Sequence, residues 1–392
     1  MTQIVSWGVL FYAFPVLVGE ITTDTGWSAT AVTLAFSGGL IISAIVGVPV
    51  GRWLDHRGPR VVMTAGSSLA AATVPAIALA PTLLWFAVAW SIAGVAQALV
   101  LYKPAFAALT GWYTEHRVRA LTTLTVVAGL SSTVFAPLTA ALASNVGWRG
   151  TYLVLGIVLA VVTIPAHAIG LNRPWPGVTR LSGHALDSLA GAATAKAVMR
   201  SPSFICLAGA MALATFALFA ATFFLVPMLT GRGMDIRTAA WALGLSGAGQ
   251  LLGRFGYGTL ARRTGPTLRA VLILTVGGFA IAATAVISAP AAAVFVVVTI
   301  LGAARGAFTL LEATAVTDRW GSAGFGALYG VFSAPSTVAI AVGPAAGAWL
   351  AGRFGGEFPL FAMLAILMLA AALAINLDHA ARRARDGRTS HS

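Results

Sequence analysis

Long apolar runs, each about as long as a bilayer-spanning helix, recur along the chain and restrict its fold more than any other feature. A helix needs about 20 mostly apolar residues to cross the hydrocarbon core of a bilayer. Only 9% of the 392 residues are charged, too few to cover a soluble protein of this size, and the mean hydropathy is +0.89. We therefore predict an all-α membrane protein with twelve transmembrane helices. Their expected spans are 3–19, 30–51, 61–80, 83–109, 118–143, 150–170, 203–229, 238–261, 268–288, 291–316, 324–351 and 358–377.

A short basic segment between two of these runs occurs twice. Residues 51–60 read Gly-Arg-Trp-Leu-Asp-His-Arg-Gly-Pro-Arg, and a degenerate copy follows 207 residues later, at 258–267. The same spacing relates Ser28 to Asp235, which we expect to be the N-caps of the second and eighth helices. An offset of about half the chain indicates an internal duplication. We predict two pseudo-symmetric six-helix halves, 1–170 and 201–377, a cytoplasmic linker at 171–200, and a frayed or disordered basic cytoplasmic tail at 378–392.

The distribution of basic residues predicts the orientation. If both termini are cytoplasmic, 17 of the 24 Lys and Arg residues fall in cytoplasmic segments, four in external loops and three inside helices. This asymmetry favours a multi-pass protein of the plasma membrane with both ends in the cytoplasm. The first apolar run is short, which we interpret as a truncated N-terminus, and no cleavable signal peptide is expected before it.

The repeated segment resembles the signature of the major facilitator superfamily, G-x-L-x-D-x-x-G-x-[RK], which lies between helices 2 and 3 of that family. Trp53 replaces the leucine of the pattern, and Arg262 stands where the second copy would have its aspartate. The resemblance covers essentially the whole chain and implies a secondary transporter that works by alternating access around a central cavity. It assigns a gating role to the matching residues of the two copies: Gly51, Asp55, Gly58 and Arg60, then Gly258 and Gly265.

Several segments are similar to the monocarboxylate transporter branch of this family. That branch has a Tyr-Ala-Phe-Pro stretch in helix 1, as at 12–15 here, followed by a lysine implicated in proton and substrate binding; Val16 takes its place. In helix 8 the branch has an acid four residues before a substrate-binding arginine, and Gln250 and Arg254 occupy these positions. The resemblance thus implies an anion-binding arginine without the protonatable acid. The helix 4–5 signature of the branch is partly matched by Trp112, Tyr113, Arg117, Ala120, Ala128 and Gly129.

Charged residues inside apolar runs are the candidates for function, because a charge in the membrane is costly unless it meets water, a partner or a ligand. We interpret Arg254 as a guanidinium that binds a carboxylate substrate; the alternative is a structural arginine paired with helix carbonyls or a neighbouring acid. Arg305 and Glu312, seven residues apart, share one face of helix 10. Substrate contact and a structural or gating network with Asp318 and Arg319 are both open for Arg305.

The remaining polar positions complete the predicted site. Gln97 lies 208 residues before Arg305, which indicates a polar position in both halves, whereas Lys103 is interpreted as snorkelling to the cytoplasmic interface. We predict a small anionic substrate such as a monocarboxylate, protons as a coupling ion through Glu312, the lipid bilayer as surroundings, and a monomer. The substrate-binding residues are predicted to be Arg254, Arg305, Tyr12, Gln97 and Gln250.

Other functions have little support. The six histidines lack metal-ligand spacing, Cys206 is the single cysteine, and no phosphate-binding loop occurs, so we predict no metal, no cofactor and no enzyme activity. Basic residues do not form a face typical of nucleic-acid binding. A drug/proton antiporter of the same family remains an alternative, although Pro137 in helix 5 lacks the preceding glycine of that group. A transporter-like membrane sensor is the second alternative, and substrate identity, direction of transport and coupling ion stay open.

Overall fold

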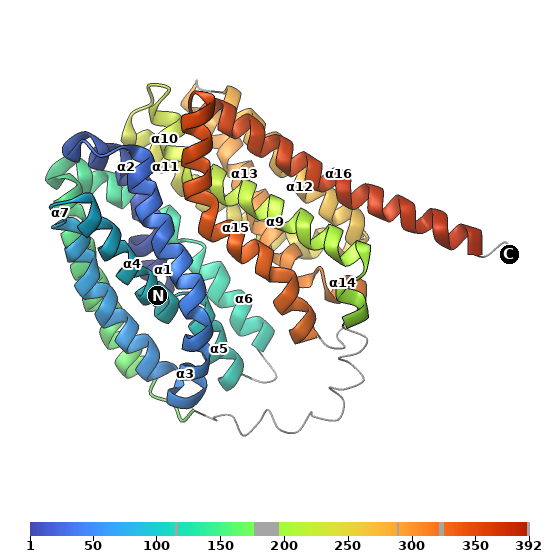
Figure 1. Cartoon of the computed structure of the whole chain (residues 1–392), viewed down its shortest axis with the longest axis horizontal. Coiled ribbons are helices and arrows are strands. Elements are labelled where there is room, and N and C mark those ends of the chain that lie inside the picture. The colour runs from blue at the N-terminus through green and yellow to red at the C-terminus, as the bar shows by residue number, and fades with distance from the viewer. Residues whose placement is uncertain (114–116, 176–195, 288–289, 321–324, 390–392) are drawn as a thin grey trace. The chain divides into compact units, whose positions relative to one another are not determined.

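The structure is a computed structural model that describes residues 1–113, 117–175, 196–287, 290–320 and 325–389 (Figure 1). Within these ranges the chain is built of helices, with no β-strand. Ten described segments are long and apolar enough to cross a membrane, which confirms the predicted all-α membrane fold. The exact count of twelve stays a prediction. The elements are α1 (Thr2–Trp7), η1 (Gly8–Tyr12), α2 (Ala13–Thr25), α3 (Ala29–Ala78), α4 (Leu83–Val100), α5 (Tyr102–Trp112), α6 (Arg117–Ala128), α7 (Ser131–Gly170), α9 (Pro202–Phe223), α10 (Leu225–Thr230), α11 (Ile236–Arg263), α12 (Pro266–Val286), α13 (Ala291–Thr314), α14 (Thr317–Trp320), α15 (Phe325–Phe354) and α16 (Glu357–Thr389).

Two long helical elements are each divided by a glycine with left-handed backbone. Gly58 has φ 75° and ψ 165° inside α3, and Gly147 has φ 68° and ψ 172° inside α7. Residues with a Cβ rarely adopt such angles, so glycine is required where the chain changes direction there. The basic segment 51–60, expected between two apolar runs, therefore contains a turn at Gly58.

Both predicted N-caps are present. The Ser28 hydroxyl accepts a hydrogen bond from the Ala31 amide at 3.2 Å, and α3 begins at the next residue. An Asp235 carboxylate oxygen accepts from the Thr238 amide at 3.0 Å, just before α11. Hydrogen bonds from the Thr238 side chain and amide lower the pKa of Asp235, because they favour its ionised form.

Several predicted helices differ from the observed ones at prolines and at a polar end. The predicted helix 83–109 is broken at Leu101 (ψ −158°), and Pro104 has no N–H to donate to the Val100 carbonyl four residues earlier. The predicted helix 203–229 is broken at Phe224, where Pro227 has no N–H to donate to the Phe223 carbonyl four residues earlier. The first helix runs to Thr25 rather than to 19.

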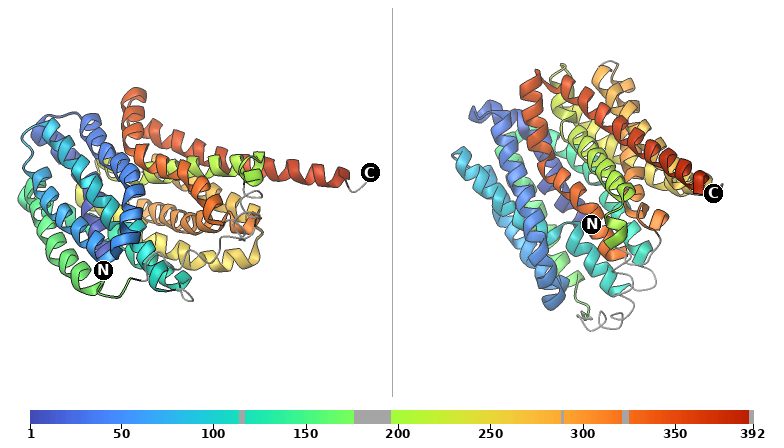
Figure 2. Two further views of the ribbon diagram at one scale, coloured as in Figure 1. Left: turned by 60° about the horizontal axis from the view of Figure 1, so that its bottom comes forward. Right: turned by 45° about the vertical axis from the view of Figure 1, so that its right-hand side comes forward.

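The prediction of a frayed or disordered tail from residue 378 is wrong as far as Thr389. Helix α16 continues through this region and extends past its neighbours within its own unit (Figures 1 and 2). Asp378 stabilises this part, because its carboxylate accepts from the Ser203 hydroxyl at 2.8 Å and pairs with Arg382, one turn on, at 2.8 Å.

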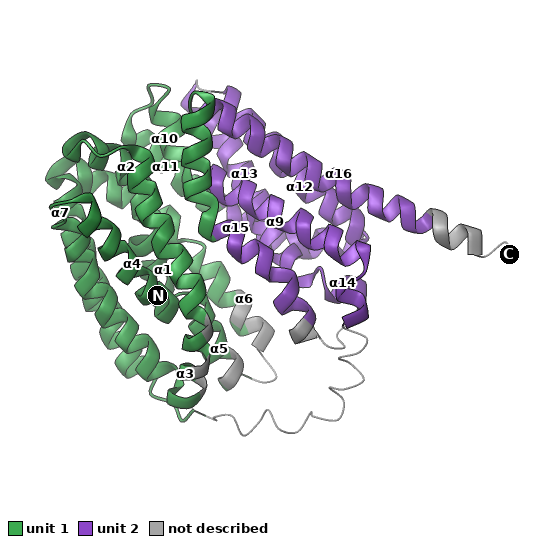
Figure 3. Ribbon diagram, viewed as in Figure 1, with its two compact units in different colours: residues 1–183, 223–248, 341–357 green, residues 184–222, 249–340, 358–392 purple. Residues whose placement is uncertain are grey.

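The chain divides into two compact units (Figure 3). Unit 1 comprises residues 1–183, 223–248 and 341–357, and unit 2 comprises residues 184–222, 249–340 and 358–392. The core of unit 1 is rich in aromatic rings: Phe14 stacks on Phe36 at 4.3 Å, and Phe223 lies 5.8 and 5.5 Å from these two rings. The predicted halves 1–170 and 201–377 follow the sequence repeat, and their boundaries stay a prediction. Most of the predicted linker, 176–195, lies outside the described residues.

Candidate functional site

In unit 2, helices α11 and α13 meet at glycines. A Cβ on Gly249 or Gly253 would collide with the carbonyls of Thr299 or Ala303, and a Cβ on Gly306 would collide with the carbonyl of Gln250. Gly249 and Gly253 form a Gly-x-x-x-Gly pair, whose lack of side chains lets membrane helices approach backbone to backbone. The crossing of α11 and α13 is thus fixed by glycines on both helices.

Two buried arginines flank this crossing. Arg254 follows Gly253 on α11 and is 8% exposed, and Arg305 precedes Gly306 on α13 and is 5% exposed. The guanidinium of Arg305 lies over the Phe219 ring of α9, 4.4 Å from its centroid, and its Nη1 has no hydrogen-bond partner among the described residues. The crossing therefore places two cationic side chains, one of them with an unused donor, inside an apolar helical unit.

The other predicted residues of unit 2 lie on the same two helices. Gln250 is 5% exposed and one helical turn before Arg254. Glu312 lies near the end of α13, beside Ser336 and Tyr329 of α15. A network of Arg305 with Asp318 and Arg319 is one of the two alternatives left open for Arg305; in the described chain Asp318 forms an ion pair with the buried Arg269 of α12.

Arg269 belongs to a polar cluster that the sequence analysis missed. Its guanidinium also lies 5.3 Å from the Tyr257 ring centroid, and the Tyr257 hydroxyl shares a 2.7 Å hydrogen bond with Thr314. The cluster links α11, α12, α13 and α14 within unit 2. Only one signal could have indicated it, namely an arginine three residues after the Gly-Pro of the second repeat copy.

In unit 1, Gln97 and Tyr12 lie near an irregular turn of the first helix. Residues 8–12 form a π-helical turn, and the Leu10 carbonyl there has Pro15 as its i+5 residue, which has no N–H. Gln97 Nε2 donates to this carbonyl at 2.9 Å, and Gln3 Nε2 donates at 2.6 Å to Val100, the carbonyl that Pro104 leaves unused. Two glutamines thus tie the first helix to α4 through carbonyls that prolines release.

This placement gives Gln97 a structural role beside the predicted substrate role. Its Oε1 is buried and has no hydrogen-bond partner in the described part of the chain, so one end of the amide is still unused. Tyr12 is 8% exposed, and its ring lies 5.2 Å from that of Phe11.

The predicted gating residues of the first copy lie at the turn in α3. Gly58 is covered by the Trp175 ring, and Arg60 Nε donates to the Ala168 carbonyl while its Nη1 donates to Asn172 Oδ1, both at 2.7 Å. Arg60 thereby caps the C-terminal end of α7, where carbonyls lack helical partners. The side chain of Asp55 lies outside the described residues.

The glycines of the two copies differ in their surroundings. Gly51 and Gly265 have open space where a Cβ would be, and Gly258 has only the end of the Arg262 side chain nearby. Gly265 is the N-cap of α12, which begins at Pro266. In the described chain, the second copy therefore keeps a helix boundary at its Gly-Pro, whereas its glycines lack the close contact that Gly58 makes with Trp175 in the first copy.

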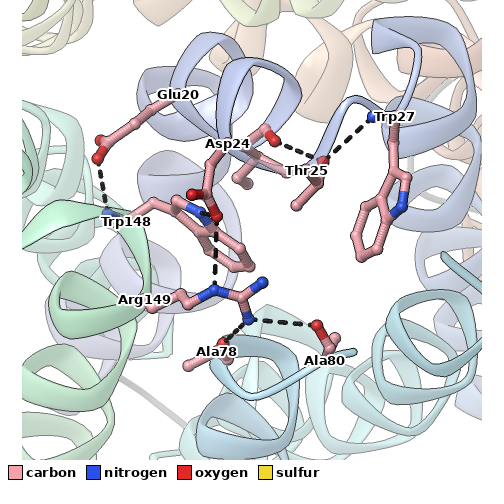
Figure 4. A network of polar contacts seen from close by, with 9 residues as sticks. Glu20, Asp24, Thr25, Trp27, Ala78, Ala80, Trp148 and Arg149 are labelled. Atoms are coloured by element: carbon pink, nitrogen blue, oxygen red, sulfur yellow. Dashed lines mark hydrogen bonds and ion pairs between the residues drawn. The ribbon is translucent and has the colours of Figure 1, made fainter. Parts of the chain in front are cut away.

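A second polar network joins three helix ends of unit 1 (Figure 4). Gly147 breaks α7, so the Trp148 amide is free for another acceptor, and Glu20 Oε1 accepts from it at 3.0 Å. Asp24 Oδ2, one turn after Glu20 on α2, accepts from the Trp148 indole Nε1 at 2.9 Å. A carboxylate at such a helix start is favoured by the orphan amides and the helix dipole.

Arg149 completes this network. Its Nη1 donates to the Ala78 and Ala80 carbonyls at 2.7 and 3.2 Å, at the end of α3, and its Nε lies 3.5 Å from Asp24 Oδ2. The guanidinium also lies 4.3 Å from the Trp148 ring centroid. From the sequence alone, Arg149 is only one of the four basic residues in predicted external loops, because its distant partners come from two other parts of the chain.

These helices, with buried cations and glycine-mediated crossings, define a polytopic helical membrane protein. The family model of the Major Facilitator Superfamily matches residues 1–274. The chain therefore belongs to the major facilitator superfamily, as its repeated segment predicted.

Curated relatives are distant. The chain is 24% identical to Monocarboxylate transporter 13 of Rattus norvegicus over 69% of this chain and 60% of that one, and 22% identical to the MFS transporter asaE of Aspergillus flavus over 68% and 59%. An uncharacterized MFS-type transporter of Bacillus subtilis, YcxA, is 26% identical over 34% of this chain and 33% of its own. The chain thus spans between a third and three-fifths of the length of these relatives.

Solved structures share the fold. The nucleoside transporter NupG superposes with a TM-score of 0.76 at 14% identity, covering 96% of this chain and 98% of that one. A bacterial homolog of the lysosomal transporter Spinster superposes with a TM-score of 0.67, also at 14% identity, covering 96% and 93%.

Proposed function

We propose that this transporter moves a small organic anion, such as a monocarboxylate, by alternating access. The observation that carries the proposal is the placement of Arg254 and Arg305 beside the glycine crossing of α11 and α13. A buried guanidinium presents several donors in a planar fork that suits a carboxylate, and inside a membrane helix bundle it marks a pathway or a binding position by default. Similarity to Monocarboxylate transporter 13 supports the same substrate class.

The proposed binding residues remain Arg254, Arg305, Gln250, Tyr12 and Gln97. Arg254 is the leading one, because it occupies the place of a substrate-binding arginine in the branch that the sequence resembles. Arg305 comes second, since the Phe219 ring already offers its guanidinium a partner. Gln97 comes last, because its side-chain amide already donates a hydrogen bond to the Leu10 carbonyl.

Alternating access is supported by the composition of unit 1. This unit joins the starts of α3 and α11 with residues 341–357, so predicted external ends of both sequence halves pack together. The Ala345 amide donates to the Ser37 hydroxyl at 2.9 Å, and Arg237 donates to Ser144 at 3.0 Å. We interpret these contacts as an external gate in its closed state, in a plasma-membrane protein with both termini cytoplasmic.

Proton coupling is the proposed energy source, with Glu312 as the proton-binding group. It is the acid that α13 carries within its apolar span. The segment with Gly51, Asp55, Gly58 and Arg60 is proposed to act at the opposite, cytoplasmic gate.

Uptake into proteoliposomes tests the proposal. Purified protein is reconstituted, vesicles are loaded with unlabelled lactate, pyruvate, succinate or uridine, and counterflow of the labelled compound is measured against empty vesicles. We expect counterflow of at least one carboxylate and none of uridine. Accumulation of a cationic dye in exchange for protons, without carboxylate flux, would instead favour the drug/proton antiporter. Binding without any flux would favour the sensor.

A further inference from the structure

Lys103 of α5 lies against a glycine of α3. Its Nζ is 3.2 Å from the point where a Cβ on Gly47 would stand, and its Cδ is 3.5 Å from the same point. Among the described residues, no acidic side chain forms an ion pair with this ammonium. The side chain therefore lies flat across a position where α3 has no side chain of its own.

This contact does not fit a lysine that snorkels to the near interface. Gly39 of α3 meets Gly94 of α4, the helix that directly precedes α5, so α3 and the α4–α5 pair run in the same direction. Gly47 is 11 residues before the turn at Gly58, or about 16 Å along the helix. Taken together, α4 and α5 end at Trp112, nine residues after Lys103. Because long side chains on a helix lean toward its N-terminus, the exposed Lys103 side chain leans away from the Trp112 end. An ammonium held at that depth needs water or an anion.

The sequence repeat gives this position a counterpart in the other half. Gly47 matches Arg254 at the offset of 207 residues, and Lys103 matches Leu311 at the offset of 208. Each half therefore has one cation at the corresponding place, carried by α5 in the first half and by α11 in the second. The missing side chain at Gly47 leaves the room that the Lys103 ammonium occupies.

We propose that Lys103 is an anion-binding residue of this transporter, with its ammonium at Gly47 taking a carboxylate group of the substrate. The inference rests on the proposed transport of small organic anions. A lysine ammonium is a compact charge whose three hydrogen-bond donors can rotate, so it can bind a carboxylate in many orientations. It therefore suits a carboxylate whose planar shape is recognised by an arginine elsewhere.

The chain contains only two lysines, Lys103 and Lys196, and this allows a chemical test with an internal control. The full-length protein in detergent is acetylated with sulfo-N-hydroxysuccinimidyl acetate, and the rate at each lysine is followed by mass spectrometry. Lactate, succinate and inorganic phosphate serve as probes, and neutral lactamide serves as the control. The exposed Lys196 should react at one rate throughout. An anion at ten times its Kd should slow acetylation of Lys103 about tenfold.

The outcomes separate this inference from the proposed function. An anion that shows counterflow in proteoliposomes yet leaves the Lys103 rate unchanged would overturn the inference and keep the transport proposal. If no anion is transported and none protects Lys103, both fail. Protection by an anion that is not transported would support the site and count against transport.

Variants keep the inference testable if the reagent cannot reach Lys103. Lys103→Met keeps the length of the side chain and removes the charge, so the KM for the transported anion should rise about tenfold or more. Lys103→Arg should recover most of this loss, and Lys196→Met should behave as the original protein. An unchanged KM in a correctly folded Lys103→Met protein would refute the assignment, because a lysine that only packs against Gly47 would not change substrate affinity.

Discussion

Replacing Arg149 by methionine should destabilise unit 1 measurably, because this one side chain joins three helix ends. It donates two hydrogen bonds to carbonyls at the end of α3, each about 1 kcal/mol for a half-exposed group. The ion pair with Asp24 adds no more than about 1 kcal/mol, since the two side chains are 41% and 52% exposed. Stacking on Trp148 adds about 0.5–1 kcal/mol. The expected loss is about 2–4 kcal/mol of the free energy of unfolding.

The assay is equilibrium unfolding in dodecylmaltoside micelles with increasing dodecyl sulfate, followed by tryptophan fluorescence. Asp24→Asn should cost less than about 1 kcal/mol, because an amide oxygen still accepts from the Trp148 indole. Arg237→Met is the matched control, since it removes one exposed hydrogen bond to Ser144 and should change stability by no more than about 0.5 kcal/mol. An Arg149→Met protein as stable as the control would refute the view that this network holds the helix ends together.

Three further changes follow from the contacts. Gly306→Ala should lower stability by about 1–3 kcal/mol in the same unfolding assay, because the new methyl group meets the Gln250 backbone, whereas Gly256→Ala, with open space at its Cβ, should be neutral. Gln97→Leu should cost about 1–3 kcal/mol, since it leaves the carbonyl that it now contacts without a donor, and a thermal melt within error of the original would contradict this. Glu312→Gln should abolish accumulation driven by a pH gradient and leave counterflow intact. Full proton-driven accumulation by this variant would show that Glu312 is not part of the coupling mechanism.

The features that could be predicted from the sequence are those set by local chemistry. The caps at Ser28 and Asp235 follow from side chains that satisfy the first amides of a helix, and the turn at Gly58 follows from a glycine in a basic segment between apolar runs. The helix breaks at Leu101 and Phe224 also have local causes. They were missed because an apolar run shows no loss of hydropathy where a proline removes one hydrogen bond.

The remaining features depend on contacts between distant residues. The partner of Gln97 is a carbonyl 87 residues earlier in the chain, released by a proline of another helix, and sequence spacing gave no reason to expect it. The partners of Arg149, at residue 24 and residues 78–80, could not be predicted for the same reason. Hydropathy also predicted disorder for the basic tail, whereas Asp378 pairs with one residue of its own helix and one of α9.

The central claim, that a buried arginine of α11 binds the anionic substrate, is tested most directly by equilibrium binding to Arg254 variants. A labelled anion that shows counterflow is titrated onto immobilised full-length protein, and size-exclusion chromatography reports whether each variant is folded. Arg254→Lys keeps the charge and loses the planar fork, so its Kd should rise about tenfold, and Arg254→Gln should raise the Kd at least about a hundredfold. A folded Arg254→Gln protein that binds the anion with the original Kd would contradict the claim and leave Arg305 as the leading candidate.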